Sequence, residues 1–338
     1  MKSLALWCFL ALFLSAMIAG ASQPANGHAI VNLMIDAQNF SSTDRASDAE
    51  RSLEAITNLI MDKNLTATIF SAQDLLETDV DLDITRLGLD PRFELAMSGK
   101  DTNEKISTLS YDEQSALLKA SKKYVEAAKI CGQNDITVYG FMPQSFNQNS
   151  DTYRALDALG IQYDAGFQAG LIYEHGHKSD VWPYQVEGFN FYAVPVSTYN
   201  ISGKAVPLRD SYFEENGMDA NQWYEALASK FDEIQGKDEP LVISLTTSVS
   251  GSGDYFDALD KFLDYAMRRD ASFVTAVQLV EMAKTGVRDP SALKSAINFT
   301  AGCTTCSESG IKMDVAVTNT SECLTCNKDN ISTDQATY

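Results

Sequence analysis

Histidine is scarce in this chain. Three of its 338 residues are histidines, at positions 28, 175 and 177. Imidazole is the commonest metal ligand and the side chain most often used for proton transfer near neutral pH. Any site that needs several histidines must therefore draw on His28, His175 and His177.

Basic side chains are also few. The chain has 26 Lys and Arg against 46 Asp and Glu, which gives a formal net charge of −20 and a pI of about 4.4. A surface with this charge repels phosphate backbones, which argues against nucleic acid as a partner. The acidic excess is typical of a solubilising coat, with cation-rich or salty surroundings as the alternative. Otherwise the composition, 45% hydrophobic and 21% charged, is that of an ordinary globular protein.

No long hydrophobic run follows Ser22, so we expect no transmembrane segment in the mature chain. Before it, Lys2 supplies a short positive region, residues 4–18 are apolar, and residues 19–21 (Ala-Gly-Ala) form a small-residue cleavage motif. A membrane anchor is the alternative, but the run is short for a span and has no basic flank. Residues 1–21 are therefore predicted to be a signal peptide that directs the protein outside the cell or to its surface.

Asparagine occurs six times in the Asn-x-Ser/Thr pattern that is glycosylated in secreted proteins. One such pattern is common by chance, but six in one exported chain predict a glycoprotein. The predicted sites are Asn39, Asn64, Asn200, Asn298, Asn319 and Asn330.

Strand-like and helix-like segments alternate from residue 29 to about 285. Apolar, β-rich stretches such as 28–35 are separated by helical patterns such as 110–130, where Ser110 and Glu113 form a capping box. This alternation predicts parallel strands that are buried on both faces. About seven such units fit an α/β barrel, in which the carboxyl ends of the strands form the site.

Seven segments follow one another in an informative order. They are VNLMIDAQNF (31–40), LTATIFSAQDLLE (65–77), FELAMSGKDTNEKISTLSYDEQ (93–114), VYGFMPQSFN (138–147), ALDALGIQYDAGF (155–167), LVISLTTS (241–248) and ALDKFLDYAMRRDASFVTAVQLVEM (258–282). In this order they resemble the strands, helices and loops of the polysaccharide deacetylases, the NodB-homology carbohydrate esterases. The resemblance implies an α/β fold, a deformed (β/α)7-type barrel over residues 28–288. A small cysteine-containing appendage follows over residues 296–338.

The resemblance also implies a metal-dependent reaction. Members of the family hold a divalent ion with one Asp and two His and activate water against an N-acetyl carbonyl. A second Asp acts as base and a late His as acid. Asp36 matches the position of the base.

Most other positions of that site carry different residues. Ala37 stands where the metal-binding Asp belongs, and Ser98 and Thr102 stand at the places of the two His. Met142 replaces an Arg, and one of the two threonines at 246–247 replaces the acid. Neutral side chains of these kinds do not make a tight first shell for zinc. We therefore expect a barrel without its metal.

A relocated metal site is one alternative. His175 and His177 could combine with Glu174 and Asp180, and with Asp36, to hold an ion. The other interpretation of this segment is a solvated polar loop, since nothing in the sequence places it over the barrel mouth.

Without a metal, the strand ends are still suited to a sugar, because acids and amides hydrogen-bond hydroxyl groups and aromatic rings stack on pyranose faces. Asp36 has a second interpretation, as an acid that accepts backbone hydrogen bonds in a loop. The residues predicted to line the mouth are Asp36, Ser98, Thr102, Gln144, Asp164, Trp182 and Tyr184.

The character of the chain changes after Pro290. Residues 296–338 are rich in Ser, Thr, Asn and Gly and contain two C-x2-C pairs separated by sixteen residues. This spacing is typical of a zinc ribbon, whereas export favours two disulfides of unknown pairing. Either would supply the staple that a short polar segment needs. The four residues are Cys303, Cys306, Cys323 and Cys326, and Cys131 is predicted to be buried and unpaired.

Together these patterns predict a secreted glycoprotein whose degenerate deacetylase-like barrel binds a glycan or cell-envelope polymer without catalysis. The alternative is an active hydrolase that deacetylates an N- or O-acetylated glycan through an altered site. A third hypothesis is a structural envelope protein whose barrel binds nothing.

Overall fold

The computed structural model describes residues 28–37, 46–76, 86–101, 103–127 and 136–293. Within these ranges nine strands form one mostly parallel sheet in the order β10-β1-β2-β3-β4-β5-β7-β6, with β11 beside β1. Its strands are β1 (Ile30–Ala37), β2 (Ala67–Ser71), β3 (Phe93–Met97), β4 (Gly140–Phe141), β5 (Tyr163–Gln168), β6 (Tyr184–Gln185), β7 (Tyr192–Val196), β10 (Pro240–Thr246) and β11 (Ser272–Val274).

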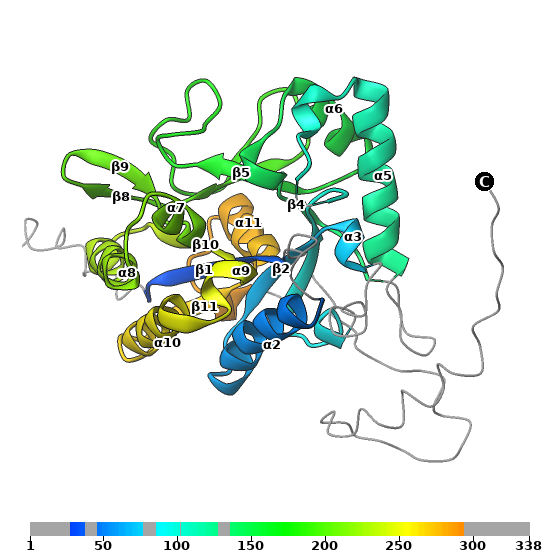
Figure 1. Cartoon of the computed structure of the whole chain (residues 1–338). Helices are drawn as coiled ribbons and strands as arrows, with labels where there is room; N and C mark the ends of the chain where they lie inside the picture. Colours follow the sequence, from blue (N-terminus) through cyan, green and yellow to red (C-terminus); the bar gives the residue numbers. More distant parts are fainter. Residues whose placement is uncertain (1–27, 38–45, 77–85, 102, 128–135, 294–338) are drawn as a thin grey trace, which may run out of the picture.

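Helices join and cover these strands (Figure 1). They are α2 (Ala46–Asp62), α3 (Gln73–Leu76), α5 (Tyr111–Ala127), α6 (Ser150–Ala158), α7 (Asp210–Glu215), α8 (Ala220–Ile234), α9 (Thr247–Ser250), α10 (Gly253–Met267) and α11 (Ala276–Thr285), with short 3-10 turns η1 (Ile106–Thr108), η2 (Gln144–Phe146) and η3 (Pro290–Ala292). The predicted α/β barrel is confirmed. No helix in the described ranges is long and apolar enough to cross a membrane.

The strands are buried on both faces because alternate residues serve two apolar layers. In β1, Val31, Leu33 and Ile35 belong to the outer layer that packs against the surrounding helices. Met34 belongs to the inner layer. The unbroken apolar sequence of this strand therefore follows from its central position.

The inside of the barrel is filled by α11, which Figure 1 shows surrounded by strands. Its Ala276, Leu279 and Val280 pack in the inner layer. Thr275 caps the helix and forms a capping box with Gln278, which fixes where the helix begins. A filled interior leaves the carboxyl ends of the strands as the place for a site.

The barrel closes between β7 and β10 without a regular ladder. The Ser197 amide donates to the Val242 carbonyl at 2.9 Å, and the Val242 amide donates to Ser197 Oγ at 2.9 Å. Nearby, the Ser244 amide donates to the Leu208 carbonyl at 3.1 Å. A serine hydroxyl thus takes the place of a backbone acceptor, and the barrel is deformed at this seam.

The sequence missed the segment that follows this seam. A hairpin of β8 (Thr198–Ile201) and β9 (Lys204–Pro207) leads into α7, and none of the three was predicted. The predicted capping box of α5 is present, because the Ser110 amide donates to Glu113 Oε2 at 2.9 Å. The helix at 151–159 and the strand at 240–246 were also placed correctly.

Several sequence predictions lie outside the described residues. These are the signal peptide at 1–21, Thr102, Cys131, four of the sequons and the whole tail at 296–338. The other two sequons, Asn64 and Asn200, are exposed, as glycan attachment requires, and their occupancy stays a prediction.

Replacing Ser197 tests the seam. We expect Ser197→Ala to lower the free energy of unfolding by about 1–3 kcal/mol, because the buried Val242 amide loses its acceptor. Denaturant titration measures the change. As a control, Thr108→Ala removes an exposed hydroxyl that donates to the Lys105 carbonyl, and should change stability by less than about 0.5 kcal/mol. Equal effects of the two substitutions would contradict the role given to Ser197.

Candidate sugar-binding site at the barrel mouth

Polar side chains from four strand ends meet at the mouth of the barrel. Asp36 ends the inward-facing row of β1, and Ser98 follows β3. The amide of Gln144, just after β4, lies between them: its Nε2 is 3.5 Å from Asp36 Oδ1 and 3.4 Å from the Ser98 carbonyl. Thr247 reaches the same point from β10, where its hydroxyl donates to the Asp36 carbonyl at 3.4 Å.

At this point the Ser98 hydroxyl still has hydrogen-bonding capacity to spare. All four residues are buried, yet the three distances are at the long end of the hydrogen-bond range. Ser98 Oγ has no hydrogen-bond partner among the described residues. A buried hydroxyl without a partner is costly, so this one is suited to a ligand atom.

The turn beside Gln144 has a strained backbone. Ser145 and Phe146 have φ values of 53° and 58°, in the left-handed region that bulky residues avoid. Such strain persists only where surrounding contacts enforce it, and it concentrates at functional sites. Here Ser145 lies in the lining of a pocket, and the Phe146 ring lies against Arg209, with its centre 5.0 Å from the guanidinium carbon.

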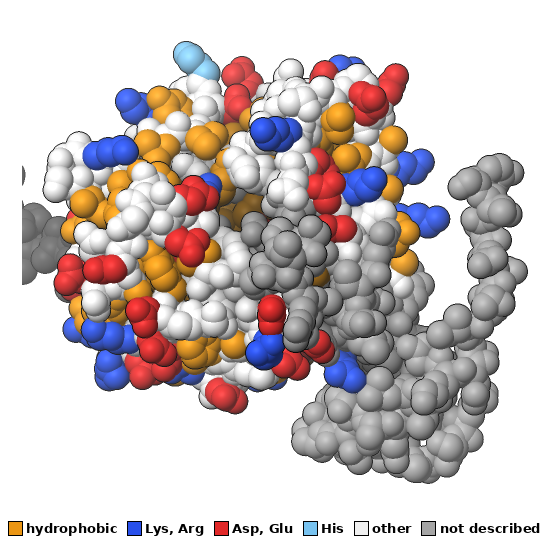
Figure 2. All heavy atoms as spheres, viewed as in Figure 1, with side chains coloured by type: hydrophobic (Ala, Val, Ile, Leu, Met, Phe, Trp, Pro, Cys, Tyr) orange, Lys and Arg blue, Asp and Glu red, His pale blue; other side chains and the backbone are white. Residues whose placement is uncertain are grey.

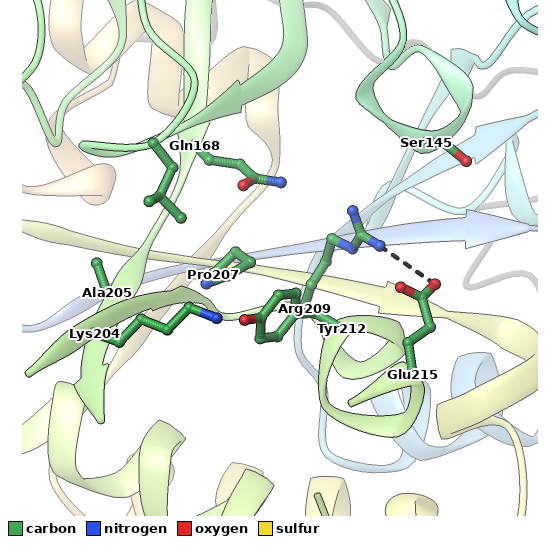
Figure 3. A pocket seen from close by; sticks show the side chains of 9 residues that line it. Ser145, Gln168, Lys204, Ala205, Pro207, Arg209, Tyr212 and Glu215 are labelled. Atoms are coloured by element: carbon green, nitrogen blue, oxygen red, sulfur yellow. Dashed lines mark ion pairs between the residues drawn. The ribbon is translucent and has the colours of Figure 1, made fainter. Parts of the chain in front are cut away.

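A pocket of about 500 Å³ opens next to this turn (Figure 3). Its volume is within the range of small-molecule sites. Most of its lining can form hydrogen bonds, and one wall is apolar. The lining residues are Ser145, Gln168, Leu171, Lys204, Ala205, Pro207, Arg209, Tyr212 and Glu215. The segment from β9 through α7, which the sequence did not predict, provides six of these nine, including Arg209 between the two elements.

The β10 end of the mouth is fixed by a buried acid. Asp210 Oδ2 accepts the Thr246 amide and the Ser250 hydroxyl, both at 2.7 Å. Burial raises the pKa of Asp210 to about 6, although these hydrogen bonds oppose the rise. Its role is to hold the turn between β10 and α9, and its oxygens are occupied by that task.

The residues at the mouth do not fit the zinc ion of deacetylases. Asp210 is occupied by the hydrogen bonds from Thr246, Ser250 and Ser211, so Asp36 is the remaining carboxylate there among the described residues. Ala37 belongs to the outer apolar layer. Ser98 offers a neutral hydroxyl, and Thr102 lies outside the described residues. One carboxylate with neutral oxygens is a poor first shell for zinc.

The described residues do not bring together the relocated metal site that was the alternative interpretation for His175 and His177. No three His, Cys, Asp or Glu side chains in the described ranges are placed to hold an ion. His177 instead stacks on Tyr184, with centroids 4.0 Å apart, and its Nδ1 is 2.7 Å from Asp180 Oδ2. His175 is exposed. The interpretation of this segment as a polar surface loop agrees with the structure.

Three residues predicted to line the mouth lie elsewhere. The Trp182 indole donates to the carbonyl of Asp238, two residues before β10, and so marks the opposite, amino-terminal end of the barrel. Tyr184 packs in the outer layer. On β5, Tyr163 faces inward and the adjacent Asp164 therefore faces outward. Alternation along a strand and the course of a long loop decide these positions, and the motif alone does not show either.

Asp164 is nevertheless unusual. It is fully buried, and burial raises its pKa to about 7, opposed by the hydrogen bond of 2.8 Å from the Gly166 amide to Oδ1. No group in the described part of the chain meets the geometry of a hydrogen bond to Oδ2, although the nearby Gln148 side chain also opposes the rise in the pKa of Asp164. Glu94 is also fully buried, and burial raises its pKa to about 7 as well.

These raised values predict a pH dependence of stability. A carboxyl whose pKa is higher in the folded state stabilises the fold fully below its unfolded pKa, near 4, and this contribution is lost as pH rises to about 7. We expect a higher melting temperature at pH 5 than at pH 8.

Asp164→Asn should remove part of this loss, at least about 1 kcal/mol between pH 5 and pH 8, because the amide stays neutral. Asp257→Asn, at an exposed position of α10, is the control and should leave the profile unchanged. A pH profile identical in wild type and Asp164→Asn would refute the explanation.

Solved structures share the fold described above. No protein-family model and no curated protein matches the sequence. A Mycobacterium smegmatis protein named as a polysaccharide deacetylase aligns with a TM-score of 0.58 and 16% identity over 79% of this chain and 93% of its own. A Pseudomonas aeruginosa PAO1 protein that is also named as a polysaccharide deacetylase aligns with a TM-score of 0.60 and 14% identity, over 79% of this chain and 94% of its own. Puue allantoinase aligns with a TM-score of 0.60 and 15% identity, over 79% of this chain and 94% of its own. The chain therefore has the α/β barrel fold of the polysaccharide deacetylases.

Proposed function

We propose that this protein is a secreted, glycosylated carbohydrate-binding protein, active at the cell envelope or outside the cell, which binds a glycan at the barrel mouth without hydrolysing it. The observation that carries the proposal is the mouth itself. It gathers buried polar groups, among them the Ser98 hydroxyl, which has no hydrogen-bond partner among the described residues, and its side chains do not fit the metal that deacetylation in this fold requires.

The chemistry of the mouth suits a polyhydroxylated ligand. Sugar hydroxyls both donate and accept, so they can pair with a hydroxyl such as Ser98 Oγ and with an amide such as that of Gln144. The adjoining pocket extends this surface with Gln168 and Tyr212. A sugar could therefore span from the strand ends into the pocket.

Hydrolysis is the second candidate, because Asp36 is present at the position of the family's base. The solved structures of this fold include proteins named as deacetylases. In this chain, however, Asp36 would have to activate water without help from a metal, and the nearby Gln144 and Thr247 are neutral. We therefore favour binding over hydrolysis.

Glycan binding can be tested by calorimetry against a panel of neutral and acidic oligosaccharides. We expect Gln144→Ala to weaken the best ligand by roughly 5- to 30-fold, since about 1–2 kcal/mol of hydrogen bonding is lost. Gln185→Ala is the matched control. Gln185 lies on the edge strand β6, away from the mouth, and its side-chain amide donates to the Phe189 carbonyl. Equal effects of the two substitutions on the affinity, or no binding of any oligosaccharide, would contradict the proposal.

The same protein should be assayed for acetate release from acetylated glycans, with and without added zinc. We expect none in either condition. Acetate release that Asp36→Asn abolishes would establish the hydrolase instead.

For the tail, we propose that Cys303, Cys306, Cys323 and Cys326 are paired either by disulfides or through zinc. If the cysteines form disulfides, alkylation changes the mass of the protein only after the protein has been reduced, and the protein contains no metal. Zinc predicts one ion per chain by elemental analysis, lost in a version that ends at Pro290. Four thiols that alkylate freely in metal-free protein would contradict both pairings.

A further inference from the structure

The pocket beside the mouth is basic in a strongly acidic protein. The chain carries a net charge of −20, and Figure 2 shows acidic and basic side chains interspersed over the face in view. The pocket nevertheless contains two cations, Arg209 and Lys204, against one acid, Glu215. Lys204 forms no ion pair with any described residue, and its nitrogen lies 5.9 Å from the centre of the Tyr212 ring.

Arg209 is held rigidly. Its side chain is only 16% exposed, its guanidinium stacks on the Phe146 ring at 5.0 Å, and its Nε donates to Ser211 Oγ at 3.1 Å. Figure 3 shows the guanidinium extending into the space between Gln168 and Ser145. The strained backbone at Phe146 places the supporting ring, so part of the local strain is used to position this arginine.

The hydrogen-bonding capacity of Arg209 is mostly unused. A guanidinium has five N–H donors, and Nε is its only nitrogen that donates a hydrogen bond within the described part of the chain. The nearest carboxylate, Glu215, is 3.7 Å away and 63% exposed, which is too far for a hydrogen bond. Largely buried charges are normally paired and hydrogen-bonded, so a site of this kind is completed by a ligand that brings a negative charge.

We propose that this pocket binds the carboxylate of an acidic sugar unit in a glycan. Arg209 forms the bidentate pair with the carboxylate, and Lys204 adds a second positive charge. Gln168, Tyr212 and Ser145 contact the hydroxyls of the same unit. The inference rests on the proposed carbohydrate binding and names the class of glycan.

The geometry favours a carboxylate over a phosphate or sulfate ester. The planar fork of a guanidinium matches the two oxygens of a carboxylate. A phosphate monoester carries up to two charges, and Glu215 and the net charge of the chain would repel it more strongly. Lys204 is a single flexible cation and does not complete a tetrahedral anion site.

Glu215 acts as a competitor. Its carboxylate lies next to Arg209 on the solvent side, so an incoming carboxylate must displace it. Removing its charge therefore strengthens binding of an acidic glycan and leaves a neutral one unaffected.

The test is calorimetry of the full-length protein with oligogalacturonate and with a neutral galactose oligomer of equal length. We expect Arg209→Gln to weaken oligogalacturonate binding by roughly 10- to 100-fold and the neutral oligomer by less than about 3-fold. Arg209→Lys, which keeps the charge and loses the fork, should lie between. Glu215→Gln should tighten oligogalacturonate about 3-fold.

Arg288→Gln is the matched control. Arg288 also stacks on an aromatic ring, Trp182, at 3.9 Å and pairs with an acid, Asp238, but it lies at the opposite end of the barrel. It should leave both affinities unchanged. Thermal melts of every variant show whether it is folded, and Glu215→Gln, at an exposed side chain, keeps the test valid if Arg209→Gln does not fold.

The outcomes separate the two proposals. If the neutral oligomer binds as tightly as the acidic one, or Arg209→Gln behaves like Arg288→Gln, the acidic-sugar inference is wrong while carbohydrate binding stands. Tighter binding of a sulfated oligomer would overturn the carboxylate. Binding of no glycan at all would overturn both.

Discussion

The fold depends on one buried carboxylate. Glu94 lies at the centre of the barrel and accepts hydrogen bonds from the Tyr163 hydroxyl at 2.7 Å, the Val277 amide at 3.0 Å and the Thr68 hydroxyl at 3.1 Å. It thereby connects β2, β3 and β5 to the first turn of α11, where the helix dipole favours a negative charge. Burial opposes that charge and raises the pKa of Glu94 to about 7. This network fixes α11 inside the barrel, where its apolar side chains pack in the inner layer.

A solid interior explains why the polar groups gather at the mouth. Beyond the strand ends the ladder stops, so backbone and side-chain groups must find other partners. Gln144 meets part of this need by bridging towards Asp36 and the Ser98 carbonyl. None of these contacts requires a metal, and the apolar Ala37 packs in the outer layer.

The sequence predicted the scaffold better than the site. The apolar run at 30–37 and the continuous strand at 240–246 are long and buried on both faces, so their composition alone indicates them. The hairpin β8–β9 has no such pattern, because its residues 198–205 are partly or fully exposed. The left-handed φ of Phe146 is enforced by tertiary contacts, against the preference of the residue itself. Arg209 was missed because its place in the pocket depends on both the hairpin β8–β9 and the left-handed backbone at Phe146.

The structure thus separates what holds the barrel from what recognises a ligand. Glu94 and α11 hold the strands from within. The pocket, by contrast, is formed mainly by the connection from β7 to β10, a segment that closes the barrel with few backbone hydrogen bonds. Such a connection can vary without cost to the core. In the proposed function, the positive charge that a metal ion supplies at the mouth of a deacetylase is supplied instead by Arg209, fixed on Phe146. A guanidinium polarises no water molecule as a metal does, but it orients a carboxylate, and the expected result is recognition without hydrolysis.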